Sequence, residues 1–119
     1  MGFTYVKVRL HNPVDLTKFD EIRLLVDMGA IFSSVPRLLL EKLGIRPIEH
    51  RGLRIYGGEI VERDIGGLVF EYSGNRAIAP VIFGEAKDTS VLGATALEAL
   101  GYQVDPTTKQ LKPTELLMI

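Results

Sequence analysis

Asp27 is the residue whose type and setting most suggest chemistry. It directly follows the apolar run Leu24-Leu25-Val26 and precedes Met28-Gly29-Ala30. A carboxylate beside core-forming residues is costly to desolvate unless it is paired or used, so Asp27 is a candidate functional group. The simpler interpretation is a turn cap, in which the carboxylate accepts hydrogen bonds from backbone N–H groups two residues on. An isolated Asp-x-Gly favours the turn cap.

Other residue types give weaker evidence for a functional site than Asp27 does. The sequence contains no cysteine, which excludes a disulfide framework, a thiolate nucleophile and a cysteine-based zinc or iron–sulfur site. His11 and His50 are far apart and have no partner at metal-ligand spacing, so we expect both in loops or at the surface. Asp64 lies among charged neighbours and Asp105 precedes a proline, a common turn arrangement, so both are weaker candidates than Asp27.

Two downstream features change the interpretation of Asp27. Val91-Leu92-Gly93 enters an expected helix 66 residues after the aspartate, and a hairpin with Gly57-Gly58 at its tip lies between them. This order resembles that of retropepsin-like (retroviral-type) aspartic proteases, especially their small non-viral cellular members. In that family apolar-apolar-Asp-Thr-Gly-Ala is followed by a flap hairpin, then by apolar-apolar-Gly and a helix.

The resemblance extends over residues 4 to 112. It includes the proline-started helix after the Asp loop, at Pro36, and the stretch Gly-Tyr-x-Val-Asp-Pro at 101–106. It implies a mainly β fold, a closed antiparallel acid-protease barrel with two short helices, that works as a homodimer. Each subunit would contribute Asp27 to a shared site, where one carboxylate activates a water and the other, protonated, polarises the peptide carbonyl. No metal or organic cofactor is implied.

The resemblance also implies roles for the neighbours of these motifs. The active-site loop would contain Met28, Gly29 and Ala30; the substrate-binding flap Tyr56, Gly57, Gly58 and Glu59; and the support behind the loop Val91, Leu92 and Gly93. The flap would close over a peptide and exclude water. The alternative for the flap residues is an ordinary hairpin turn, and for the supporting residues simply a place in the core.

Met28 departs from the family pattern, which has Thr or Ser at this position. That hydroxyl bonds across the dimer axis to the partner's loop, and methionine offers at best a weak sulfur acceptor. Losing such a buried bond costs about 1–3 kcal/mol if a partner N–H is left unpaired. A weakened enzyme, an inactive enzyme kept as a binding dimer, and a substitution introduced into this sequence all remain open.

Three functional hypotheses follow. The first is a homodimeric aspartic endopeptidase that hydrolyses peptides or unfolded proteins with bulky apolar side chains, bound by strand addition under the flap. The second is a catalytically inactive dimer of the same fold that binds peptides or proteins. The third, outside the family, is a β-rich interaction domain in which Asp27 only caps a turn.

The elements that must position these residues can be read from hydrophobic periodicity. Period-two alternation predicts strands over residues 4–10 and 19–26, antiparallel to each other. Further strands are expected over 31–35, 53–56, 60–72, 76–83 and 90–93. Helices are expected over 37–43 and 94–100, each ended by a glycine. The Gly66-Gly67 pair, inside a predicted strand, suggests a bulge or bend.

An internal similarity relates the two helices. Leu40-Glu41-Lys42-Leu43-Gly44 matches Leu97-Glu98-Ala99-Leu100-Gly101 at an offset of 57, and a short apolar strand precedes each copy. The pattern Leu-Glu-x-Leu-Gly also spells a generic helix end. Together with the preceding strands, it suggests two similar halves.

Length and composition limit the remaining possibilities. With 119 residues and a net charge of -1, we expect a single domain over residues 1–119 with no nucleic-acid or membrane partner. The absence of a signal-like N-terminus and of an apolar span predicts a cytoplasmic protein. The apolar tail at 116–119 would be a sticky edge in a monomer, so we expect it in a dimer sheet; the alternative is folding back on its own domain.

Overall fold

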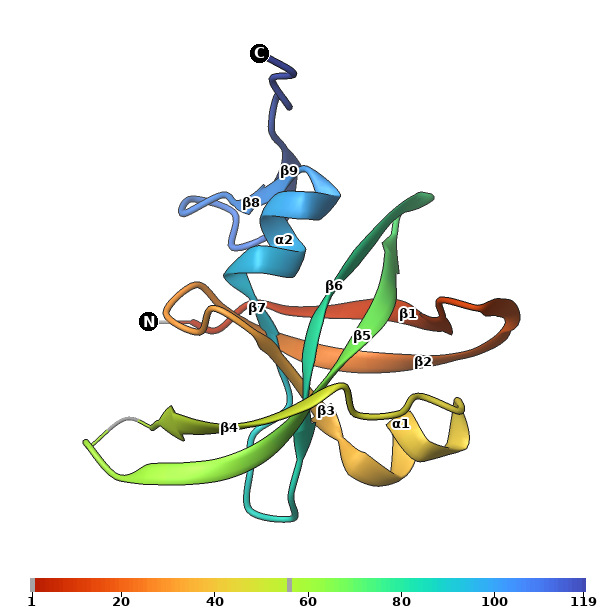
Figure 1. Cartoon of the computed structure of the whole chain (residues 1–119). Coiled ribbons are helices and arrows are strands. Elements are labelled where there is room, and N and C mark those ends of the chain that lie inside the picture. The colour runs from red at the N-terminus through yellow and green to blue at the C-terminus, as the bar shows by residue number, and fades with distance from the viewer. Residues whose placement is uncertain (1, 56) are drawn as a thin grey trace.

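The chain is mainly β, as predicted. A computed structural model describes residues 2–55 and 57–119 and is shown in Figure 1. The strands are β1 (Tyr5–Asn12), β2 (Asp15–Asp27), β3 (Ser33–Pro36), β4 (Glu49–Arg54), β5 (Ile60–Tyr72), β6 (Asn75–Gly84), β7 (Val91–Gly93), β8 (Tyr102–Val104) and β9 (Leu111–Pro113). The helices are α1 (Arg37–Lys42) and α2 (Ala94–Leu100).

The alternation of the first strands has the predicted consequence. Thr4, Val6, Val8 and Leu10 are all buried, while the residues between them are exposed or half-buried. β1 and β2 pair antiparallel, in a register that places Tyr5 opposite Leu25. One face of this hairpin therefore supplies core side chains, and β2 delivers its last residue, Asp27, to the end of the strand.

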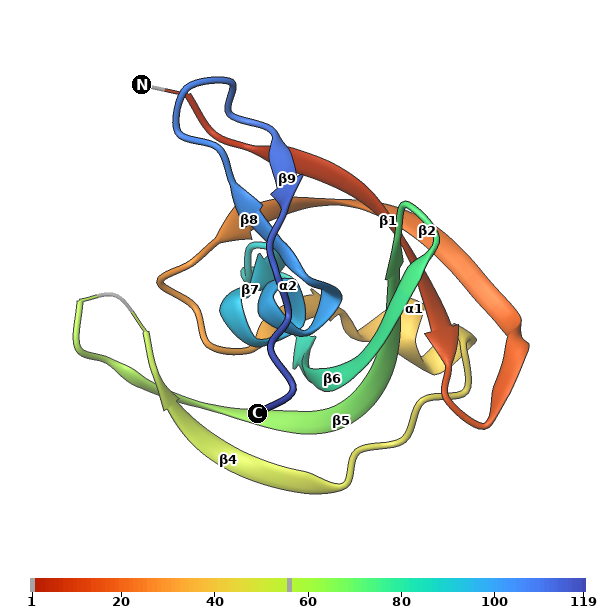
Figure 2. The ribbon, with the colours of Figure 1, turned by 90° about the horizontal axis from the view of Figure 1, so that it is seen from above.

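The sheet has seven strands in the order β1-β2-β7-β3-β6-β5-β4, and β1 also pairs with β5 (Figure 2). The pairing path through β2, β7, β3, β6 and β5 therefore returns to β1. The expectation of an antiparallel sheet needs correction, because β2–β7 and β3–β6 are parallel pairs. Parallel pairs arise here because β7 and β3 are each inserted between strands of the other half of the chain.

The two halves suggested by the sequence are visible in the topology. The expected order of strands, short strand and helix occurs as β1-β2-β3-α1 and again as β5-β6-β7-α2. Each half gives its short strand to the other half, since β7 pairs with β2 and β3 pairs with β6. The offset of 57 relates the start of α1 to the start of α2, and it relates Asp27 to Gly84.

Both helices end as their glycines predict. Gly44 and Gly101 have φ of 80° and 85°, in the left-handed region where glycine is favoured. α2 packs on β6 and buries Ala96, Leu97 and Leu100. The core around it is formed largely by aliphatic residues together with Phe70 and Phe83.

Two local expectations need correction. Of the bulge or bend suggested at Gly66-Gly67, the bulge is absent, because the two glycines lie in an unbroken register opposite Val81 and Pro80. A Cβ at Gly66 would lie 3.0 Å from the Phe83 ring, so close packing accounts for that glycine. His11 was expected in a loop or at the surface but is 2% exposed, and its Nε2 lies 2.6 Å from Glu71 Oε1.

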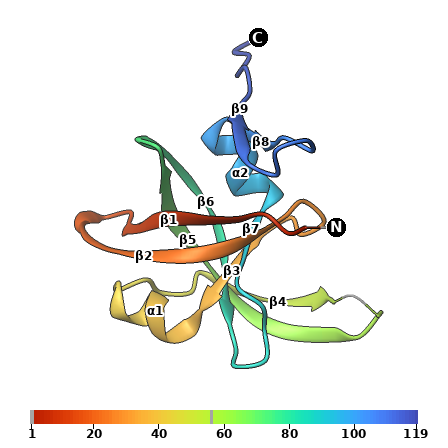
Figure 3. The same ribbon diagram turned by 180° about the vertical axis from the view of Figure 1, so that it is seen from behind.

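The C-terminal segment projects from the rest of the chain beyond β9, as Figure 3 shows from behind. β8 and β9 form a separate two-stranded sheet next to α2. The side chains of Leu116, Leu117, Met118 and Ile119 are all exposed. Within the part of the chain that the structure describes, neither helix is long and apolar enough to cross a membrane.

Candidate active site

Asp27 lies at the last position of β2, opposite Gly93 of the parallel strand β7. Its Oδ1 accepts a hydrogen bond from the backbone N–H of Gly29, at 3.0 Å, and its carbonyl accepts one from Ala30, at 3.2 Å. A Cβ on residue 29 would lie 3.2 Å from the same Oδ1, so a side chain there would crowd the carboxylate. The first of these contacts is the turn cap expected for a lone Asp-x-Gly; the side chain is exposed, with Oδ2 toward the adjoining space.

The loop after Asp27 is fixed by the start of α2. The backbone N–H of Ala94 donates to the Ala30 carbonyl at 2.8 Å, and that of Thr95 donates to the Ile31 carbonyl at 3.1 Å. The first N–H groups of a helix have no partner inside the helix, so the loop carbonyls satisfy donors that would otherwise need water. The loop of residues 28–32 is thereby attached to the second half of the chain.

Gly93 allows this attachment by its lack of a side chain. A Cβ there would lie 2.6 and 2.7 Å from the carbonyl carbon and oxygen of Phe32, and 2.9 Å from the Ala30 oxygen. The φ of Gly93 is -86°, which any residue adopts, so the requirement is steric. Val91 and Leu92 are buried beside it. The structure thus places Gly93 directly against the loop after Asp27, while Val91 and Leu92 pair with Leu25 and Val26 of β2.

Ser33 is a polar member of this arrangement that the sequence did not reveal. Its Oγ accepts a hydrogen bond from the Gly93 N–H at 2.9 Å, and Ser33 is 1% exposed. The two residues are 60 positions apart, so no local pattern connects them. The sequence signal available for this contact was a serine at a core-facing position of a predicted strand, since a buried hydroxyl needs a hydrogen-bond partner.

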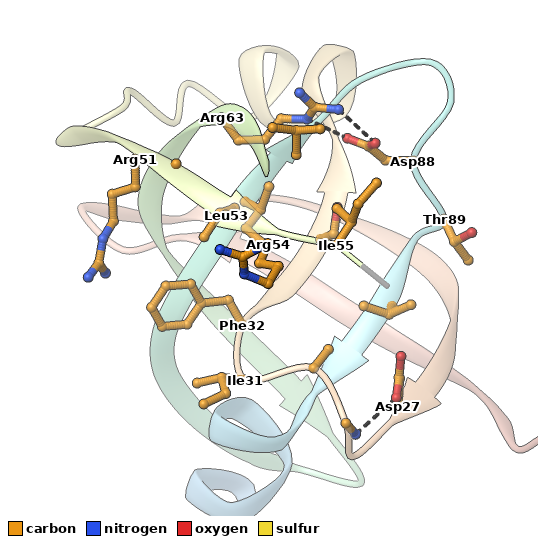
Figure 4. A pocket seen from close by; sticks show the side chains of 17 residues that line it. Asp27, Ile31, Phe32, Arg51, Leu53, Arg54, Ile55, Arg63, Asp88 and Thr89 are labelled. Carbon is orange, nitrogen blue, oxygen red and sulfur yellow. Dashed lines mark hydrogen bonds and ion pairs between the residues drawn. The ribbon is translucent and has the colours of Figure 1, made fainter. Parts of the chain in front are cut away.

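A pocket of about 800 Å³ opens beside Asp27. It is lined by Asp27 and residues 29–32 of the loop after it, by residues 51–55, 61 and 63 of the β4–β5 hairpin, and by residues of the 88–91 segment (Figure 4). Among the predicted loop residues Gly29 and Ala30 line it, whereas Met28 is not part of the described lining and is 49% exposed. Hairpin and loop lie on the same side of the molecule in Figures 1 and 2.

The hairpin tip has the geometry that its glycines predict. Gly57 and Gly58 have φ of 104° and 93°, and the Gly58 N–H donates to the Ile55 carbonyl at 3.0 Å. The Ile55 N–H in turn donates to the Glu59 carbonyl at 2.8 Å. Tyr56 lies outside the described residues. The described tip residues 57–59 are not part of the pocket lining.

The base of the hairpin is tied to the segment before β7 by an ion pair that the sequence also did not reveal. Arg63 Nε and one terminal nitrogen donate to the two carboxylate oxygens of Asp88, at 2.7 and 2.9 Å. Asp88 Oδ2 also accepts from the Glu85 N–H at 2.8 Å. The bidentate Arg63 contact is the largest cause of a pKa of Asp88 below its usual value.

The weaker carboxylate candidates have structural partners. Asp64 accepts hydrogen bonds from His50 Nδ1 at 2.8 Å and from Arg37 at 2.9 Å, and these contacts lower its pKa. Asp105 accepts from the Thr107 N–H at 2.8 Å, as a turn cap does. Within residues 2–55 and 57–119, no group of three histidine or acidic side chains is placed to hold a metal ion.

Comparison with known proteins gave one structural likeness. The sequence matches no protein-family model, and no curated protein matches it. A structure similar to this chain is the crystal structure of a retropepsin-like aspartic protease from Rickettsia conorii. The sequences are 20% identical, the match covers 88% of this chain and 89% of the other, and the TM-score is 0.48. At this identity the likeness concerns the course of the backbone and not individual side chains.

Proposed function

We propose that two copies of this chain form an aspartic endopeptidase in which each contributes Asp27. The observation that carries the proposal is the placement of the Asp27 carboxylate in the lining of a pocket that is bounded on another side by residues 51–55, 61 and 63 of the β4–β5 hairpin. Of its two oxygens, Oδ1 is held by Gly29, and no described residue donates to Oδ2. Oδ2 is therefore open to a water molecule or to a second carboxylate.

The reaction follows from two carboxylates that share one proton. Two such groups close together do not both ionise readily, so one is a base and the other an acid at the same pH. The base removes a proton from a bound water, whose oxygen attacks the peptide carbonyl carbon while the acid donates a hydrogen bond to the carbonyl oxygen. The tetrahedral intermediate then collapses: the C–N bond breaks, and the nitrogen leaves with a proton from the pair. No covalent enzyme intermediate forms.

The second carboxylate of the pair is expected from another copy of the chain. The other carboxylate in the described pocket lining is Asp88, and Arg63 binds both of its oxygens. Residues 116–119 are exposed and apolar, which is unfavourable for an isolated chain and supports a subunit interface. Deleting residues 114–119 is expected to shift dimers to monomers in analytical ultracentrifugation. A stable dimer after the deletion would contradict this role of the tail.

The pocket supports an extended peptide as the substrate. β4 is an edge strand of the sheet, so part of its backbone is free to pair with an added strand. Apolar side chains, among them Ile31, Leu53 and Val61, line the space next to it. We infer that bulky apolar side chains of the peptide occupy this space while the hairpin closes over it as a flap.

The proposal is tested by cleavage of a mixed peptide pool between about pH 3 and 7, a range that brackets carboxylate titration. The wild-type chain and Asp27→Asn are compared at equal concentration, with mass spectrometry as the readout. Asn has nearly the same shape but cannot act as the base, so cleavage is expected to disappear in the variant. Equal cleavage by both proteins would show that Asp27 does not carry the activity.

A second candidate function, an inactive dimer that binds peptides, is favoured by Met28. Thr or Ser at this position would supply a hydroxyl for the loop of the partner subunit, and methionine does not. Met28→Thr is therefore expected to raise cleavage relative to wild type, and Met28→Val, which has the shape of threonine without its hydroxyl, is the matched control. If neither wild type nor Met28→Thr cleaves while both bind peptides, the binding function is the better description.

A further inference from the structure

The charged side chains of the pocket differ in how many ion pairs and hydrogen bonds they make within the chain. Apart from Asp27, the described lining contains three arginines and one carboxylate, Asp88. Arg63 is 15% exposed and binds Asp88 through two nitrogens, so this pair is internally neutral. Arg54 donates from Nη1 to the Gly58 carbonyl at 2.6 Å, within the hairpin. Arg51 is the third arginine, and its ion-pair partner among the described residues is Glu49.

Arg51 has a weak partner. Its Nε lies 3.1 Å from Glu49 Oε1, and both side chains are about half exposed. Exposed ion pairs of this kind contribute little to stability, because water and salt screen them. A guanidinium has five N–H donors, and no contact to a described residue engages the terminal nitrogens of Arg51. They are therefore available to a carboxylate from outside the chain.

Arg51 places its charge at the margin of the cleft. Arg51 is opposite Arg63 in the β4–β5 register, so both side chains are on the hairpin face that bounds the pocket. The guanidinium carbon lies 5.7 Å from the centre of the Phe32 ring, which belongs to the active-site loop. A cation near an aromatic face is attracted by the ring, so Phe32 helps to position the half-exposed guanidinium of Arg51 for an anion.

Arg51 is also well separated from the proposed catalytic group. Figure 4 shows it at the side of the pocket away from Asp27, with Phe32 and the hairpin side chains between them. An extended peptide advances about 3.3–3.6 Å per residue. If its scissile bond lies at Asp27, a side chain elsewhere along the peptide reaches Arg51 and not the bond itself.

We propose that Arg51 makes this cleft selective for peptides that carry an acidic side chain away from the cleaved bond, between otherwise apolar residues. This inference rests on the proposed endopeptidase function and specifies its substrate class. The carboxylate of the peptide would accept N–H bonds from the terminal nitrogens of Arg51 and displace the weak contact with Glu49. Electrostatic complementarity of this kind adds specificity to an apolar cleft.

The test uses peptides that differ only by Glu or Gln at one position, with each position up to four residues on either side of the cleaved bond examined in turn. We expect one position at which Glu raises kcat/KM about five- to tenfold over Gln. Arg51→Gln is expected to bring this ratio close to one, whereas Glu49→Gln, which removes the competing carboxylate, is expected to raise it. Arg9→Gln is the matched control, because Arg9 also lies over a phenylalanine ring, at 4.7 Å, but outside the pocket.

The outcomes separate the inference from the function on which it rests. Cleavage without an acidic preference at any position, or a preference that persists in Arg51→Gln, would overturn the inference and leave the endopeptidase intact. If the wild type does not cleave, the same peptide pairs are measured by fluorescence anisotropy on Asp27→Asn. An Arg51-dependent Glu preference in binding would then support the inference about the cleft while contradicting catalysis, and equal or absent binding would overturn both.

Discussion

Gly93 offers the sharpest test of how this fold holds its candidate site. Replacing it by alanine places a methyl carbon 2.6 Å from the Phe32 carbonyl carbon and 2.7 Å from its oxygen. A third backbone atom, the Ala30 oxygen, is 2.9 Å away. The obstructing atoms belong to the backbone of residues 30 and 32, in the loop after Asp27, so no side-chain rotation relieves the overlap. The loop, β7 or both must move.

The size of the effect follows from the cost of overpacking, which is typically 1–3 kcal/mol. Because three backbone atoms are involved, we expect Gly93→Ala near the upper end, about 3 kcal/mol. For a chain of this length that corresponds to a fall in Tm of roughly 12 °C. Urea unfolding followed by circular dichroism, at fixed protein concentration because of the expected dimer, measures the free energy of unfolding directly. We also expect Gly93→Ala to lose peptide cleavage at temperatures at which it is still folded, because the displaced loop begins at Asp27.

Gly67→Ala is the matched control. Gly67 lies inside β5, a Cβ added to it would meet no heavy atom within 4 Å, and its φ is not in the left-handed region. Alanine there restricts the unfolded chain and is expected to leave stability unchanged or raise it by about 0.4–1 kcal/mol. If Gly93→Ala were as stable as wild type, or if Gly67→Ala lost as much stability, the steric reasoning would be refuted.

Three further predictions concern neighbouring contacts. Ser33→Ala leaves the buried Gly93 N–H without its acceptor and is expected to lower the free energy of unfolding by about 1–3 kcal/mol in urea titration. Because Arg63 lowers the pKa of Asp88, that pair stabilises the fold above the ordinary carboxyl value of 3.8 and loses its effect as the pH falls through the lower folded value. Asp88→Asn is therefore expected to flatten the dependence of Tm on pH in this acid range; an unchanged slope would show that the pair contributes nothing. Gly58→Ala meets no steric obstacle but has φ of 93°, so about 1–2 kcal/mol of backbone strain is expected, visible as a lower Tm than that of Gly67→Ala.

Much of the fold follows from local regularities of the sequence. The alternation in β1 predicts which of its residues are buried, because successive side chains of a strand point to opposite faces. Gly44, Gly101 and the Gly57-Gly58 pair mark the turns where positive φ is needed. The 57-residue offset anticipates two similar halves, since similar sequences form similar local units. Period and turn chemistry are short-range properties, so they can be read without knowing the fold.

The candidate site could be predicted only in part. Asp27 stands out because a carboxylate at the end of an apolar strand is unusual. The order of the motifs, which resembles that of retropepsin-like proteases, led us to expect β7 behind it. The parallel pairing of β2 with β7 and of β3 with β6 could not be derived from periodicity, which gives no strand order. His11 shows the same limit, because its neighbours suggest a turn while its burial depends on Glu71, 60 residues away.

Local sequence patterns are enough to predict most strands, both helices, the main turns and the repeated half, and they single out Asp27, because each of these features depends on neighbouring residues. They did not predict β8 and β9, and they placed β4 at 53–56 where the strand spans Glu49–Arg54. The tertiary structure alone decided which distant groups meet. It placed Ser33 against Gly93, Arg63 against Asp88 and Arg51 over Phe32. Of these three contacts, Ser33–Gly93 joins the two halves of the chain, and the energies of all three depend on distances that are defined by the folded chain.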